Sequence, residues 1–193
     1  MVARMDIHVA PVELGKAIRL INHGPTTLVS AHHAGVDNVM AAAWVCALNF
    51  EPPQLTATID GETATRRLIE GSGRFVIQLP TVAQLQLTHA VGNTSLNDTP
   101  DKLARCGVEL FRMDGHPEPF VAGCAAWLLC RVVPEPHNQE NYDLFIGEVI
   151  GAWADTRVFR NGRWHFEEAD PSCRTIHHVA GGQFYAIGDG LKP

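Results

Sequence analysis

Apolar residues along this chain gather mainly in short runs bounded by glycine, proline or charged residues. Three such runs, residues 26–31, 54–59 and 74–79, have the β-branched and aromatic content that predicts strands. Two longer runs, residues 121–133 and 144–153, are apolar nearly throughout. The second contains two interior glycines, which suit a strand that bends around a barrel. The pattern therefore predicts a mainly β protein.

Helical patterns are fewer and shorter. They favour helices over residues 13–21, 65–70 and 99–106, the last beginning with Thr-Pro-Asp. Strands and helices do not alternate regularly, which disfavours a doubly wound sheet. Neither GxGxxG nor GxxxxGK[ST] occurs, so a Rossmann or P-loop nucleotide site is not predicted. We expect a closed antiparallel barrel with a few peripheral helices.

Composition and charge narrow the class of protein and its partners. With 193 residues, 46% of them apolar, the chain suits one domain, which we expect to span residues 1–193. The formal net charge is −6 and no basic run exceeds Arg66-Arg67, which argues against nucleic acid as the main partner. No segment approaches the ~20 apolar residues of a membrane span, and the start lacks the apolar run of a signal peptide. We expect a cytoplasmic protein.

Cysteines and histidines form no familiar metal or disulfide pattern. The five cysteines are odd in number and lack CxxC spacing, which indicates reduced thiols. Cys124 and Cys130 are interpreted as core thiols. Two pairs of adjacent histidines occur, at residues 32–33 and 177–178, but neighbours on a strand point to opposite faces. We predict no metal site.

Five segments, spread from about the twentieth residue almost to the end, carry a more specific pattern. They read GPTTLVSAH with DNVMAAAWVCALNFEPP, then ETATRRLIEGSGRFVIQLP, GNTSLNDTPDKLARCG, CAAWLLCRVV with DLFIGEVIGAWAD, and RTIHHVAGGQFYAIG. In this order they resemble the flavin reductase-like, FMN-binding split-barrel family. The resemblance implies a mainly β, FMN-binding split β-barrel with a few peripheral helices, and FMN as the cofactor.

FMN requires a flat apolar slot for its ring, polar groups for the pyrimidine edge, and an anion site for its phosphate. The resemblance implies flavin contacts along one stretch: Asn38, Val39, Met40, Ala41, Ala42, Ala43 and Trp44. Three consecutive alanines carry little side chain, so a planar ring can approach the backbone closely. Without the surrounding motifs, the same stretch would indicate a buried strand with a core tryptophan.

A phosphate site is predicted where the second helix begins. A helix N-terminus offers free N–H groups and a favourable dipole, threonine hydroxyls add donors, and an arginine pairs with the dianion. The candidates are Thr63, Thr65 and Arg66, with Arg67 as the alternate arginine. Lys102 matches an Asp-Lys-Phe pattern of the family and would add a cation. The alternative is a simple threonine cap beside two solvated arginines.

Two further positions follow from the resemblance. Gly181-Gly182-Gln183-Phe184-Tyr185 resembles the Gly-Gly-x-aromatic ending of the family, which implies Phe184, or Tyr185 after a slip of one position, against the flavin. Many members also carry a histidine just before the strand that corresponds to LFIGEV. Tyr142 takes that place here, and tyrosine does not titrate near neutrality.

The resemblance implies an oxidoreductase, most directly an NAD(P)H-dependent flavin reductase. A flavoredoxin-type electron carrier and a non-catalytic flavin-binding barrel are the alternatives, because one fold serves several activities. The pattern leaves the choice of NADH or NADPH, the electron acceptor and the catalytic residues open. The long apolar runs and the resemblance predict a homodimer with the flavin near the interface.

Overall fold

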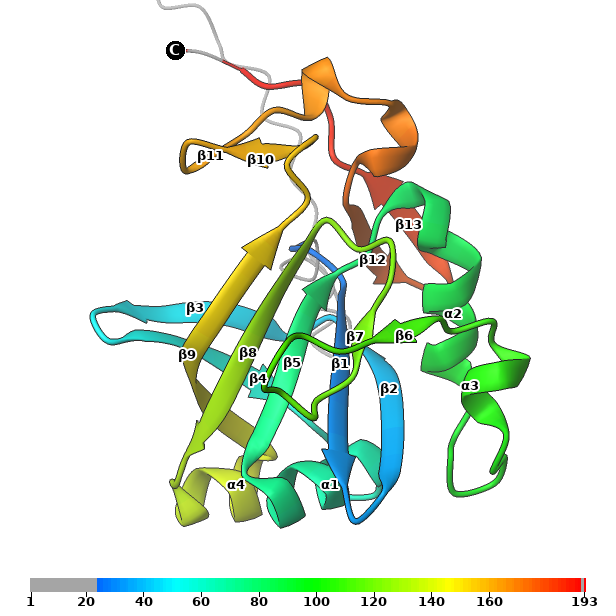
Figure 1. Cartoon of the computed structure of the whole chain (residues 1–193), viewed down its shortest axis with the longest axis vertical. Helices are drawn as coiled ribbons and strands as arrows, with labels where there is room; N and C mark the ends of the chain where they lie inside the picture. The colour runs from blue at the N-terminus through cyan, green and yellow to red at the C-terminus, as the bar shows by residue number, and fades with distance from the viewer. Residues whose placement is uncertain (1–23, 192) are drawn as a thin grey trace, which may run out of the picture.

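The computed structural model describes residues 24–191 and 193, and its main feature is one strongly curved antiparallel sheet (Figure 1). Its seven strands are ordered β2-β1-β5-β8-β9-β4-β3. Their bounds are β1 Thr27–His33, β2 Val36–Ala42, β3 Val45–Phe50, β4 Pro53–Thr58, β5 Arg74–Leu79, β8 Ala126–Val133 and β9 Leu144–Ala154. The prediction of a mainly β protein is confirmed, and four of the five apolar runs become strands with nearly the expected bounds.

Three two-stranded ribbons and several helices surround this sheet. The ribbons are β6 Leu110–Phe111 with β7 Phe120–Val121, β10 Phe159–Arg160 with β11 Arg163–Trp164, and β12 Ile176–Ala180 with β13 Gln183–Ala186. The α-helices are α1 Ala64–Ser72, α2 Leu85–Asn93, α3 Lys102–Arg105 and α4 Pro136–Tyr142. Short 3-10 turns are η2 Val82–Gln84, η3 Phe166–Glu168 and η4 Pro171–Cys173. Figure 1 shows α1 and α4 at one end of the sheet and β10–β11 at the other.

The helix prediction is confirmed for α1 and in part for α3, which occupies only the end of residues 99–106. The helix expected over residues 13–21 lies outside the described residues. Helix α2 was not predicted. No helix in the described part of the chain is long and apolar enough to cross a membrane.

The expected strand over residues 121–133 is interrupted. The chain turns after β7 at Gly123, whose φ of +86° favours glycine, and re-enters the sheet as β8. Gln84 stabilises this turn, since its side-chain amide donates a 2.7 Å hydrogen bond to the carbonyl of Ala122. Because both segments are apolar, the sequence predicts one strand where the structure has two, β7 and β8.

The sheet is not closed by strand pairing among the described residues, which corrects the expectation of a closed barrel. Strands β2 and β3 are the two edges of the order, although they follow one another directly in the chain. At the corner between them, the carbonyl of Trp44 accepts a 3.0 Å hydrogen bond from the amide of Thr58. After this corner β3 pairs with β4 and not with the free edge of β2.

The main core lies between the concave face of the sheet and helix α1. Phe75 and Phe145 are its largest fully buried members, and Ile69 of α1 packs in the same cluster. A Cβ on Gly147 would come within 2.6 Å of the Phe75 ring, so glycine is required for this close approach. Cys124 and Cys130 are buried as predicted, and burial raises the pKa of each thiol to about 12.

Candidate functional site

Two adjoining cavities lie where edge strand β2 meets helices α1 and α2. The larger has a volume of about 470 Å³ and the smaller about 220 Å³. They share Ala41, Gly92 and Asn93 in their walls. A Cβ on Gly92 would stand 3.2 Å from the Ala41 Cβ, so α2 packs directly on β2 at the junction. One elongated ligand could therefore reach both cavities.

The larger cavity is built on the beginning of α1. Thr63 caps this helix by accepting a 3.3 Å hydrogen bond from the amide of Arg66, and Ala64 and Thr65 follow it into the cavity wall. The Asn38 amide donates a 2.9 Å hydrogen bond to Thr65 Oγ1. Asn38 Oδ1 is buried and has no hydrogen-bond partner among the described residues. A ligand donor would satisfy it.

Lys102 supplies the larger cavity with a buried cation. The residue is only 2% exposed, and no carboxylate of the described chain lies within ion-pair distance of its ammonium group. Burial lowers its pKa, because the ammonium loses hydration, and the nearby Cys106 offsets this effect only in part. Three exposed acidic residues also line this cavity: Asp60, Glu62 and Asp98. An anion beside Lys102 and the α1 N-terminus would offset the cost of the buried charge.

The smaller cavity is largely apolar along one wall. Ala41, Ala42 and Ala43 line one side, and Phe184 of β13 lines another. The Phe184 ring contacts two histidines, with its centroid 5.0 Å from that of His178 and 6.4 Å from that of His89. This arrangement suits a planar ring.

The same cavity contains an unsatisfied polar atom. Thr88 is 1% exposed, and its Oγ1 has no hydrogen-bond partner among the described residues. Tyr185, the alternate to Phe184, is 55% exposed and does not line either cavity. The structure therefore brings Phe184, and not Tyr185, to the site.

Most of the predicted contacts come together, and some do not. The set that lines the two cavities is Asn38, Met40, Ala41, Ala42, Ala43, Thr63, Thr65, Lys102 and Phe184. Val39 is fully buried and packs in the core with Leu28 instead, deeper on the face of β2 that also carries Ala41. Trp44 and Tyr142 are 56% and 63% exposed and line neither cavity.

Arg66 is also absent from the cavity wall. Its guanidinium donates to Glu70 at 2.8 Å, to the carbonyl of Gln139 at 2.7 Å, and to Asp143. These partners hold α1 against α4, so the donors expected for a phosphate are already used. The neighbouring Arg67 donates to Asn97 Oδ1 at the rim of the larger cavity.

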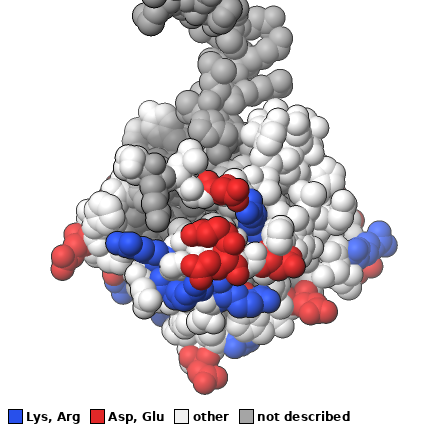
Figure 2. Space-filling view, turned by 90° about the horizontal axis from the view of Figure 1, so that it is seen from above, with Lys and Arg blue, Asp and Glu red and all other residues white. Residues whose placement is uncertain are grey.

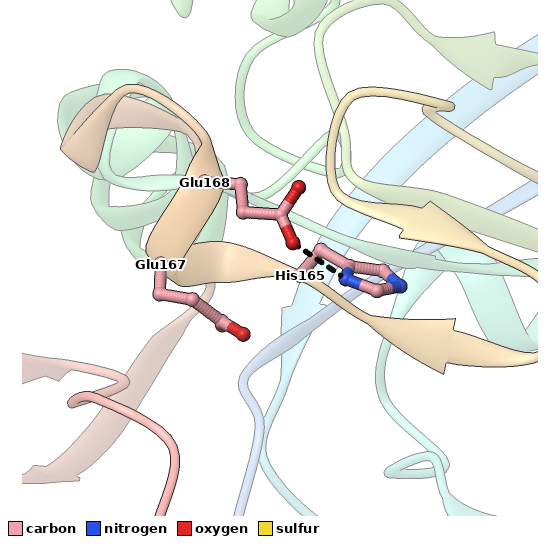
Figure 3. A group of neighbouring side chains, drawn as sticks. All are labelled: His165, Glu167 and Glu168. Carbon is pink, nitrogen blue, oxygen red and sulfur yellow. Dashed lines mark hydrogen bonds and ion pairs between the residues drawn. The ribbon is translucent and has the colours of Figure 1, made fainter.

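A separate charged cluster lies around β10–β11 and η3, at the end of the molecule away from α1 and α4 (Figure 1). Figure 2 shows acidic residues and arginines side by side on this end. In Figure 3, His165 Nδ1 lies 3.2 Å from Glu168 Oε1, and Glu167 completes a group whose ligand atoms lie within 4.8 Å of one another. His165 and Arg160 both bind the Glu168 carboxylate and lower its pKa. We interpret the group as a surface ion-pair cluster, and the absence of a metal site stays a prediction.

Sequence reasoning missed the contribution of α2 and the loop that follows it. Thr88 and His89 line the smaller cavity from α2, and residues 94–98 line the larger one. A signal was present, because Thr81-Val-Ala-Gln84 matches the capping-box pattern of a helix start. In the structure Gln84 Oε1 accepts a 3.2 Å hydrogen bond from the amide of Thr81.

Comparison with known proteins identifies the family of this chain. The family model described as "Flavin reductase like domain" matches residues 20–171, which is most of the chain. The chain belongs to this flavin reductase-like family. The predicted resemblance is therefore confirmed.

Relatives of this flavin reductase-like protein cover nearly its whole length. An uncharacterized Escherichia coli K12 protein, YddH, is 42% identical in an alignment of 181 positions that covers 92% of this chain and 94% of YddH. The crystal structure of an FMN-binding domain of flavin reductases-like enzyme from Shewanella baltica OS155 is 64% identical, with a TM-score of 0.87, and covers 96% of this chain and 100% of its own.

A third structure, a split barrel domain protein from Shewanella frigidimarina NCIMB 400, is 17% identical with a TM-score of 0.75. It covers 97% of this chain and 98% of its own, and at this identity the likeness concerns the fold. The fold class is accordingly a split barrel, as predicted. Its curved sheet has the strand order described above.

Proposed function

We propose that this flavin reductase-like protein binds FMN across the two adjoining cavities and acts as an NAD(P)H-dependent oxidoreductase. The observation that carries the proposal is the buried Lys102 ammonium, which has no carboxylate partner among the described residues and lines the same cavity as the start of α1 and the unsatisfied Asn38 Oδ1. A phosphate would supply the missing counter-charge, and ribityl hydroxyls would supply the missing donor. The Shewanella baltica relative, at 64% identity, is itself an FMN-binding domain, which supports the choice of ligand.

Each part of FMN has a matching part of the site. The phosphate would lie in the larger cavity, against Lys102 and the free N–H groups that follow the Thr63 cap. The ring would occupy the smaller cavity between the alanines of β2 and Phe184, where Thr88 offers a hydroxyl to its polar edge. When bound, FMN supplies the hydride chemistry, and the chain binds and orients the ring and sets its surroundings.

The proposed reaction takes a hydride from NADH or NADPH and passes the electrons to an acceptor such as free flavin. The first test is the absorbance spectrum of freshly purified protein, with mass spectrometry of the ligand it releases. Bound FAD, or no change in thermal stability with micromolar FMN, would exclude the proposed ligand. Steady-state oxidation of NADH and NADPH, with and without added FMN or FAD, then tests the reaction. Bound FMN without such oxidation would favour an electron carrier or a non-catalytic flavin protein.

We further propose that the protein works as a homodimer with the flavin near its interface. The β3–β4 hairpin carries exposed apolar side chains, with Leu48 at 50% and Phe50 at 98% exposure, and Trp44 precedes it at 56%. An apolar cavity of about 330 Å³ continues from this hairpin onto the sheet. Apolar surface of this extent on one face is typical of an interface. Trp44 could then approach the flavin of a partner subunit. A cytoplasmic location stays a prediction.

A further inference from the structure

The two walls of the larger cavity come from segments that are far apart in sequence. One wall is the start of α1, and the other is the loop from Thr94 to Asp98, which leads into Lys102. Asn97 makes two hydrogen bonds to residues at the start of α1. Its Nδ2 donates a 3.0 Å hydrogen bond to the carbonyl of Glu62, and its Oδ1 accepts a hydrogen bond from Arg67 Nη2. One side chain thus joins the loop to the helix.

The loop itself is held together by its own hydrogen bonds. The amide of Asn97 donates to Ser95 Oγ at 3.1 Å, and that of Thr99 donates to the Ser95 carbonyl at 3.0 Å. The amide of Lys102 donates in turn to the Thr99 carbonyl at 3.0 Å. These bonds link Ser95 to Lys102 in one hydrogen-bonded segment. A contact that holds Asn97 against α1 therefore also helps to hold the Lys102 ammonium in place relative to the N-terminus of α1.

This geometry gives Arg67 a different role from direct phosphate binding. Its side chain is exposed and does not line the cavity, and its guanidinium ends on Asn97. Arg67 would therefore affect a ligand by holding Asn97, and with it the cavity wall, in place. It would not contact the ligand itself.

We propose that Asn97, held by Arg67, is a positioning residue that clasps the Ser95–Lys102 segment to α1 and slows the release of the FMN phosphate. The inference rests on the proposed FMN site. It predicts an effect on ligands that carry the phosphate, because only these use Lys102 and the α1 N-terminus together. A flavin without the phosphate would gain little from the clasp.

The experiment compares FMN and riboflavin binding by flavin fluorescence, with FMN release followed by stopped flow. Asn97→Ala should weaken FMN about threefold to tenfold, as expected for exposed hydrogen bonds, and mainly through faster release. Riboflavin affinity should change by less than about twofold. Arg67→Ala should give a smaller loss, and none once Asn97 is already alanine, because the two residues act through one contact. Arg105→Ala removes another exposed arginine, paired with Asp101 at 2.9 Å, and is the matched control.

Unchanged FMN release in Asn97→Ala, or a parallel loss for riboflavin, would overturn the clasp. Asn97→Leu removes both hydrogen bonds, keeps the side chain near its original size and adds no charge to the cavity, so it provides a second variant if the alanine variant folds poorly. It should release FMN as fast as Asn97→Ala does, and release at the rate of the unaltered protein would overturn the clasp. An inert Arg67→Ala beside a fast-releasing Asn97 variant would show that Arg67 plays no part. If the unaltered protein binds neither flavin, the proposed function fails first. If it binds FMN and the variants behave like it, only the clasp fails.

Discussion

Lys102 shows how a single residue can be costly for the fold and useful for a ligand. An ammonium that is 2% exposed without a carboxylate partner in the described chain destabilises the ligand-free protein. Lys102→Met should therefore raise the thermal stability of the FMN-free protein. It should also weaken FMN by about 1.5–3 kcal/mol, roughly ten- to 150-fold, and leave riboflavin nearly unchanged. Calorimetric melting and fluorescence titration measure the two effects. Equal losses for both flavins would show that the variant acts through the fold.

The pH dependence of FMN binding follows from the same residue. Because burial lowers the pKa of Lys102, its ammonium loses the proton at a lower pH than an ordinary lysine does. FMN affinity should fall as the pH rises through this lowered pKa, and Lys102→Met should flatten that limb. In the ligand-free protein the unfolded chain binds this proton more tightly than the folded one. The contribution of Lys102 to stability therefore improves with rising pH, up to the ordinary lysine range. Titrations from pH 7 to 10 test both signs.

Thr88 offers a contrast, because its unsatisfied hydroxyl lies in the ring cavity and not at the phosphate. Thr88→Val keeps the shape and removes the buried polar atom, so the ligand-free protein should gain about 1 kcal/mol in its free energy of unfolding. Flavin binding should weaken about fivefold, and equally for FMN and riboflavin, since both carry the ring. Urea unfolding and paired titrations provide the measurement. A loss confined to FMN would place the ring elsewhere.

At the scale of elements, Arg66 joins α1 to α4 and to the end of β4. Its side chain is 10% exposed and donates to the carbonyls of Ile59 and Gln139 as well as to two carboxylates. Arg66→Met leaves these carbonyls without a donor and should cost about 1–3 kcal/mol of unfolding free energy. FMN affinity of the folded protein should stay within about twofold. The Arg105 side chain is 68% exposed in its ion pair with Asp101, so Arg105→Met should change the free energy of unfolding by less than about 0.5 kcal/mol. A large loss of FMN affinity in Arg66→Met would restore its predicted contact with the phosphate.

The elements that sequence reasoning located well are those whose local signals agree with their burial. Strand β5 has the predicted bounds, because β-branched residues, a flanking glycine and the burial of its four central residues coincide there. The failures arise from contacts between distant residues. Gln84 stabilises the turn before β8 through a side-chain hydrogen bond from outside residues 121–133, where Gly123 is the local sign of that turn. Helix α2 has polar residues at several positions, and its capping signal lies in the preceding turn.

At the scale of the whole molecule, the family resemblance located the site better than any single motif did. It brought together residues from β2, α1, α3 and β13 that the fold does place around two joined cavities. It did not distinguish Arg66 from Arg67, because their different partners lie on α4 and on the loop after α2. The resemblance also implies flavin contacts for Trp44 and Tyr142, but in the single chain both are largely exposed and line neither cavity.

The exposed apolar hairpin leads to the last prediction, which concerns assembly. Phe50 and Leu48 lie on β3, an edge strand exposed along almost its whole length, and such a strand is normally covered or made polar in a monomer. Light scattering at low micromolar concentration should report a dimer, which Leu48→Ser with Phe50→Ser should shift toward monomer. Leu191→Ser alters an equally exposed apolar residue near the C-terminus and should leave the mass unchanged. If the flavin site includes the partner's side chains, FMN should raise the melting temperature of the dimer, and the monomeric variant should bind FMN more weakly. A monomer that holds FMN tightly would contradict both the pairing and the shared site.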